Sequence, residues 1–75
     1  MLFVSGLIDM QIRLNGEAKT VSDNTTIQHL IEQMGLTGQR YAVEVNESIV
    51  PRSRHALHTL NAHDKVEIVQ AIGGG

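Results

Sequence analysis

The C-terminal sequence Ile72-Gly73-Gly74-Gly75 places three glycines directly before a carboxylate. Glycine has no Cβ, so a nucleophile can approach the Gly75 carbonyl without crowding, and the bare backbone can thread a narrow channel. A carboxylate repels nucleophiles and lacks a leaving group, so it would react only after activation. Glycine runs also occur in linkers and at frayed chain ends. The pattern alone leaves both a reactive terminus and a linker remnant open.

The other residues that could do chemistry form weaker patterns. His55 and His58 have the i, i+3 spacing of one helical face, with His63 nearby, but no carboxylate stands at a convincing ligand spacing. These imidazoles, and His29 in a polar helical stretch, are predicted to be solvated rather than metal-bound. The serines lack the glycine elbow of hydrolases, and no helix follows the glycines as in a phosphate loop. We expect no catalytic residue, metal or nucleotide site on this chain.

Composition narrows the class of protein further. The 75 residues include six basic and eight acidic side chains, for a formal charge of −2, and no cysteine. This length fits one domain. The only aromatic residues are Phe3 and Tyr41, without a basic stripe, so nucleic-acid binding is not expected. The apolar stretch 1–8 is shorter than the roughly 18 residues of a membrane span. The lack of cysteine fits a reducing compartment, so a cytoplasmic location is predicted.

The first half of the chain shows a hairpin followed by a helix. Apolar residues alternate over 10–14, Asn15-Gly16 is typical of a type I′ turn, and 17–21 returns as a second strand. Thr25 is the predicted helix cap, with the helix starting at Thr26. Its inward residues recur at i, i+3, i+4 and i+7: Ile27, Leu30, Ile31 and Met34. Gly35 is predicted to end the helix.

The second half predicts three strands, over 41–45, 48–50 and 65–71, with a short helical turn over 52–57. Strands interrupted by one main helix indicate an α+β fold with a mixed sheet of four to five strands and the helix packed across one face. The expected topology is a β-grasp, in which the last strand pairs beside the first. We expect a domain over 10–72, an extension over 1–9 that is disordered or reflects an upstream start, and a flexible reactive tail over 73–75.

Three segments carry a family resemblance: "MQIRLNGE", "AVEVNESIVPRSRHA" and "DKVEIVQAIGGG". From Met10 to Gly75 the chain resembles the ubiquitin-like sulfur carriers, most closely the ThiS family of thiamin thiazole biosynthesis. The middle segment is the more family-specific one, because a terminal Gly-Gly also occurs in ubiquitin and in molybdopterin-synthase small subunits. The nine-residue extension and the additional Gly73 depart from the family pattern.

The resemblance implies a carrier or co-substrate rather than an enzyme. A ThiF-type adenylyltransferase would use ATP and Mg²⁺ to adenylate the Gly75 carboxylate, with no cofactor bound by this chain. A persulfide donor of the cysteine desulfurase or rhodanese type would then displace AMP and leave a thiocarboxylate. A thiazole synthase of the ThiG type would receive the sulfur. Gly73 and Gly74 would pass through the partner's channel, at an ordering cost of about 1–2 kcal/mol per residue.

Possible partner contacts lie beside this tail. If Val66 and Ile68 face inward, Lys65, Glu67 and Val69 face outward, which makes Val69, Ala71 and Ile72 candidates for an apolar docking patch. Arg52 and Arg54 could pair with an acidic partner surface, although such arginines are often simply solvated.

Three alternatives remain open at this stage. A related carrier could deliver sulfur to another acceptor, such as molybdopterin or an amino acid. A ubiquitin-like modifier would instead form an isopeptide on a target lysine. A passive β-grasp interaction module would tolerate loss of Gly74 and Gly75.

Overall fold

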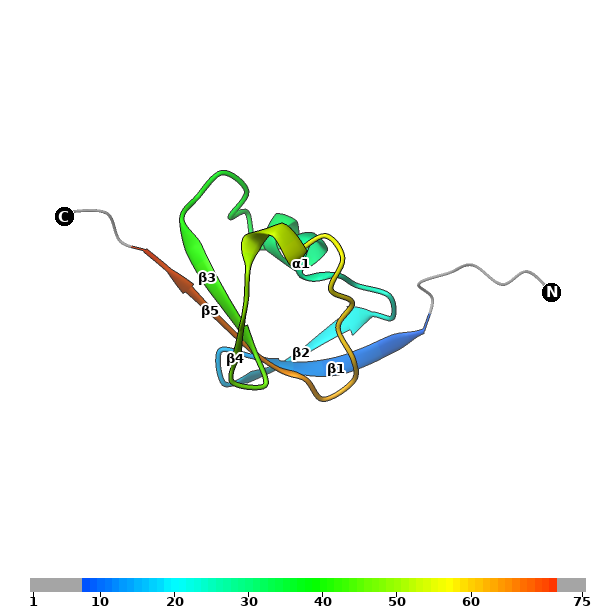
Figure 1. Ribbon diagram of the computed structural model, residues 1–75. Coiled ribbons are helices and arrows are strands. Elements are labelled where there is room, and N and C mark those ends of the chain that lie inside the picture. The colour runs from blue at the N-terminus through cyan, green and yellow to red at the C-terminus, as the bar shows by residue number, and fades with distance from the viewer. Residues whose placement is uncertain (1–7, 72–75) are drawn as a thin grey trace.

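The computed structural model describes residues 8–71, and a curved sheet wraps around its helix (Figure 1). The elements are β1 (Asp9–Leu14), β2 (Glu17–Ser22), α1 (Ile27–Gln33), β3 (Tyr41–Val45), β4 (Ser48–Val50), the 3₁₀ helix η1 (Arg52–Arg54) and β5 (Lys65–Gln70). The predicted elements are confirmed. β1 begins one residue earlier than predicted and β5 ends one residue earlier, while the expected helical turn is regular only over η1.

Two-residue turns of left-handed backbone close both hairpins. Asn15 and Gly16 have φ of +51° and +85°, and Asn46 and Glu47 have φ of +51° and +71°. Positive φ at both central positions matches the right-handed twist of the flanking strands, as the Asn15-Gly16 sequence predicts for the first hairpin. The turns set the register, which pairs Leu14 with Glu17 in the first hairpin.

β5 lies in the middle of the sheet, whose order is β2-β1-β5-β3-β4. It runs parallel to β1, where Leu14 pairs with Val66, and antiparallel to β3, from Tyr41 opposite Gln70 to Val45 opposite Val66. The last strand therefore joins the two hairpins, which confirms the predicted β-grasp topology.

The start of α1 corrects the predicted cap by one residue. Thr26 is the N-cap: its Oγ1 accepts from the His29 backbone N–H at 3.1 Å, and His29 Nδ1 accepts from the Thr26 backbone N–H at 3.4 Å. This is a capping box with histidine in the place usually taken by Glu or Gln. Thr25 is buried, and its hydroxyl donates to the Ser22 carbonyl at 2.6 Å, so it closes the preceding turn instead.

The helix ends as predicted. Gly35 has φ of +72°, its N–H donates to the Glu32 carbonyl, and the Leu36 N–H donates to the Ile31 carbonyl. This pair of bonds is a Schellman motif, which satisfies carbonyls that the helix leaves without partners.

One apolar layer lies between the sheet and α1. The buried residues are Ile12, Val21, Ile27, Leu30, Ile31, Val43, Val45, Leu60, Val66 and Ile68. All the predicted inward positions of α1 and β5 are among them except Met34, which is half-buried at the margin. The strands contribute alternate residues, so their other face points away from the helix.

Two asparagines from the hairpin turns hold β5, one at its first residue and one near its middle. Asn15 Oδ1 accepts from the Ile68 N–H at 2.8 Å, and its Nδ2 donates to the Ile68 carbonyl at 3.3 Å. Asn46 Oδ1 accepts from the Lys65 N–H at 2.9 Å, and its Nδ2 donates to Asp64 Oδ1 at 3.0 Å. The Asn15 side chain thus continues the pairing of β1 with β5 beyond the end of β1.

Replacing Asn15 with glycine should lower the free energy of unfolding by about 1–2 kcal/mol, because two hydrogen bonds are lost while the positive φ is kept. Urea denaturation measures this change. Asn24→Gly is the matched control, since Asn24 has φ of +67° but lies in an exposed loop away from β5. Equal effects of the two substitutions would contradict a role for the Asn15 side chain.

Candidate functional site

The chain is fixed in place up to Ala71, the last residue before Ile72 and the glycines. The Ala71 N–H donates to the Arg40 carbonyl at 2.9 Å, and Gln70 Nε2 donates to Gln39 Oε1 at 3.4 Å. We call Gln39, Arg40, Tyr41, Arg52, Gln70 and Ala71 the tail root. The predicted site residues Ile72, Gly73, Gly74 and Gly75 lie outside the described residues.

Two residues of the tail root, Arg52 and Tyr41, form a stack with His55 on the helix side of the sheet. The Arg52 guanidinium carbon lies 4.5 Å from the Tyr41 ring centroid, and Arg52 Nη2 donates to the Gln39 carbonyl at 3.1 Å. The rings of Tyr41 and His55 stack with centroids 5.8 Å apart and an interplanar angle of 22°. Arg52 is exposed, yet it contacts Gln39 and Tyr41, which lie beside the end of β5.

The prediction that His55 is solvated is wrong. Its side chain is buried, and Nε2 lies 2.9 Å from the Val50 carbonyl oxygen. A carbonyl only accepts, so Nε2 is the donor in this bond, while Nδ1 is buried without a hydrogen-bond partner among residues 8–71. η1 reverses the chain after β4 and brings the His55 ring against Tyr41. The spacing of residues in the sequence does not predict this contact.

The other histidines stay at the surface. His29 and His63 are exposed and His58 is half-buried. Within the described part of the chain, no three His, Cys, Asp or Glu side chains are grouped so that they could hold a metal ion. Nor does any described helix have the length and apolar character needed to cross a membrane.

The face of β3, β4 and β5 that points away from α1, which we call the open face, is apolar near the tail root. Val69 is 66% exposed and lies opposite Ala42, and Ile49 on β4 is 72% exposed. Val69 and Ala71 are exposed while Val66 and Ile68 are buried, which confirms the predicted orientation of β5. Ala42 and Ile49 join this surface only because of the strand register, so sequence reasoning missed them.

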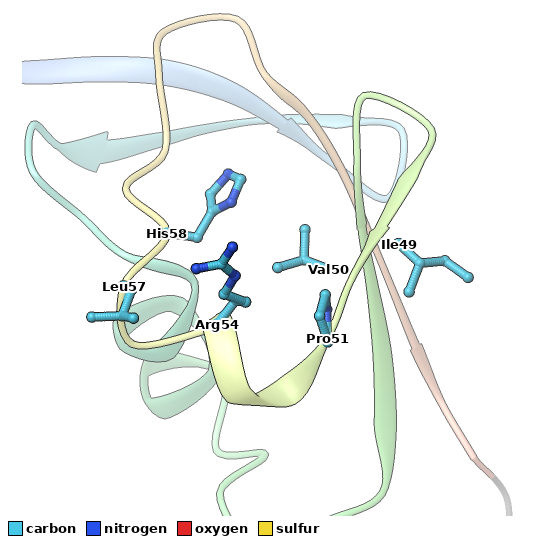
Figure 2. Close-up of a pocket in the computed structure, with 6 residues that line it drawn as sticks. All are labelled: Ile49, Val50, Pro51, Arg54, Leu57 and His58. Carbon is cyan, nitrogen blue, oxygen red and sulfur yellow. The ribbon is translucent and has the colours of Figure 1, made fainter.

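Arg54 occupies a different environment from Arg52. It lines a cavity of about 320 Å³ together with Ile49, Val50, Pro51, Leu57 and His58. Figure 2 shows the Arg54 and His58 side chains close together on one side of this space, with Val50 directed into it from β4. Arg52 thus contacts residues of the tail root, whereas Arg54 lines the neighbouring cavity. A cationic group beside apolar walls suits a carboxylate carried on an apolar surface.

The sequence of this chain is similar to known sulfur carrier proteins and to parts of known thiazole synthases. The sequence pattern of the ThiS family matches residues 12–75. The sulfur carrier protein ThiS of Escherichia coli is 33% identical over 66 residues, which cover 88% of this chain and all of that protein. A thiazole synthase of Paramagnetospirillum magneticum is 41% identical over 66 residues, and the chain spans only about a fifth (20%) of its length.

Solved structures agree with the fold. The thiamine biosynthesis protein ThiS from Geobacter metallireducens superimposes with a TM-score of 0.75 and 25% sequence identity, covering 88% of this chain and 100% of that one. The elements that position the tail root therefore belong to a fold shared with a ThiS protein.

Proposed function

Because the chain belongs to the ThiS family, we propose that it is the sulfur carrier for the thiazole ring of thiamin, with the sulfur held as a thiocarboxylate on Gly75. The observation that carries this proposal is the family match over residues 12–75, which includes the three glycines after the tail root. On this proposal the chain is a co-substrate of other enzymes rather than an enzyme, and it acts in the cytoplasm.

The proposed chemistry begins with activation of the Gly75 carboxylate. A carboxylate oxygen attacks the α-phosphorus of ATP on a ThiF-type adenylyltransferase with Mg²⁺, and pyrophosphate leaves. The terminal sulfur of a persulfide then attacks the carbonyl carbon, and AMP leaves. A thiol cleaves the resulting acyl disulfide, which forms a protein disulfide and releases the thiocarboxylate. This chain has no cysteine, so both sulfur groups must come from its partners.

A thiazole synthase of the ThiG type is the proposed acceptor of the sulfur. Support comes from the thiazole synthases that contain a segment 36–41% identical to this chain. In those proteins a carrier-like segment and the named synthase share one polypeptide. We propose that this chain meets a synthase of the same kind.

The proposed docking surface combines the tail with the open face. Val69 and Ala71 would contact apolar partner residues, continued by Ile72. Arg54 at the cavity and Arg52 beside the tail root would pair with partner carboxylates. In this arrangement the folded body binds the partner while the glycines deliver the carboxyl group.

Intact mass spectrometry tests the proposal. The chain is incubated with the adenylyltransferase, Mg-ATP and a persulfide donor, and should gain the mass difference between sulfur and oxygen. Addition of the synthase with its other substrates should reverse this gain. Failure to gain sulfur, or transfer of the carboxyl group to lysines of other proteins, would overturn the assignment.

Val69→Ser should weaken binding to the adenylyltransferase about tenfold without unfolding the chain, because an exposed valine that a partner buries contributes roughly 1.5 kcal/mol or more. Affinity is measured by calorimetry. Ile8→Ser is the control, since Ile8 is 67% exposed and directly precedes β1, whose start lies far from the end of β5 (Figure 1). Similar affinities for the two variants would contradict the proposed docking role of Val69.

A further inference from the structure

Two carboxylates face each other on the open face. Glu44 of β3 and Glu67 of β5 are direct partners in the antiparallel register. Each alternates with buried residues of its own strand, so both side chains point away from α1, and both are half-buried. Like charges placed directly opposite on a sheet destabilise it. The chain therefore retains a repulsive pair next to the surface that leads to its tail.

No cation of the described chain forms an ion pair with either glutamate. Lys65, the next outward residue on β5, pairs through Nζ with Glu47 Oε2 at 3.6 Å, the one ion pair found within residues 8–71. Arg13 lies beside Lys65 on β1 and donates from Nη1 to the Gly16 carbonyl. Both cations lie further from the tail root than the two glutamates.

The surroundings of the pair define what would fit there. Towards the tail root the next outward pair is Ala42 with Val69, and on β4 the exposed Ile49 lies opposite Glu44. A partner that covers these apolar side chains would remove water from the carboxylates, which strengthens any charge interaction there. A planar guanidinium can donate to two carboxylates at once through its fork of N–H groups.

We infer that Glu44 and Glu67 form a receptor for an arginine that the tail-binding partner presents among apolar side chains. This inference rests on the proposed function and names the charge of the partner surface. The free carrier bears the repulsion, and the arginine relieves it on binding. A surface with a carboxylate at this position would be rejected, so the pair also discriminates between partners.

The test measures stability and affinity on the same variants. Glu44→Gln and Glu67→Gln should each raise the melting temperature of the free chain by about 1–5 °C, since each removes one of two like charges that lie directly opposite on the sheet. Each should weaken binding to the adenylyltransferase or to the thiazole synthase about tenfold, because one charge-assisted hydrogen-bonded contact is lost. Glu44→Lys should be at least as stable and should bind more weakly still, because the introduced ammonium satisfies Glu67 and repels the arginine.

Glu17→Gln is the matched control, because it removes the same charge from an exposed position on β2, at the other edge of the sheet. It should leave both measurements unchanged. Unchanged affinity of the Glu44 and Glu67 variants for both enzymes, or a lowered melting temperature in the glutamine variants, would overturn the inference. A wild-type chain that gains sulfur while these variants bind normally refutes only this inference. A wild-type chain that binds neither enzyme refutes the proposed function and, with it, the inference.

Discussion

Deletion of Gly74 and Gly75 is expected to abolish sulfur loading completely while leaving the melting temperature unchanged. The last hydrogen bond of the described chain joins Ala71 to Arg40, upstream of the deletion, so the folded body keeps its contacts. The new terminus would fall short of the position at which the partner activates the carboxylate. Intact mass after incubation with adenylyltransferase, Mg-ATP and persulfide donor gives the readout.

A chain with a C-terminal carboxamide distinguishes the effect of tail length from the effect of losing the carboxylate. It preserves all 75 residues but removes the oxygen nucleophile, so it should bind the adenylyltransferase and fail to load sulfur. Removal of residues 1–7 serves as the control truncation and should leave loading intact. Sulfur loading by the Gly74–Gly75 deletion would show that the reacting group is not the terminal carboxyl of Gly75.

Replacement of His55 with alanine should cost about 3 kcal/mol of unfolding free energy. The substitution opens a cavity beneath Tyr41 and removes the only described partner of Nε2, the Val50 carbonyl. A chain of this size has a total stability of roughly 4–11 kcal/mol, so the loss is a large share of it. Urea denaturation should show an earlier midpoint with an unchanged slope.

Two further variants identify the cause of that loss. His58→Ala should change stability by less than about 0.5 kcal/mol, because His58 is half-exposed and lies outside the core cluster. His55→Phe keeps the ring against Tyr41 but loses the bond to Val50, so it should fall between wild type and His55→Ala. Equal stability of the His55→Ala and His58→Ala variants would mean that the stack does not support the fold.

Local patterns in the sequence were sufficient to predict most of the fold. The Asn15-Gly16 turn, the Gly35 helix end and the spacing of Leu30 and Ile31 each depend on neighbours a few residues apart, and the structure confirms them. The predicted helix cap was one residue too early because two adjacent threonines can both act as a cap. The Thr25 hydroxyl donates to the Ser22 carbonyl, so Thr26 caps the helix instead.

The candidate site was harder to predict because its contacts join distant segments. Burial of His55 requires η1 to fold back against β3, which no local spacing encodes. The bond between Gln39 and Gln70 and the opposition of Glu44 and Glu67 appear only when the register of β3 and β5 is known. The outward direction of Val69, by contrast, follows from alternation within a single strand and was correctly predicted.

The central position of β5 has a consequence for how the protein is made. This strand is synthesised after the other four described strands, yet among them it alone connects the β1–β2 hairpin to the β3–β4 hairpin. A nascent or prematurely terminated chain that lacks it holds two separate ribbons with exposed apolar faces, which are unstable in water and are targets for proteases. Cells would thus accumulate only molecules whose translation has passed Gln70, so that quality control of folding also selects for chains that carry the segment leading to the glycines.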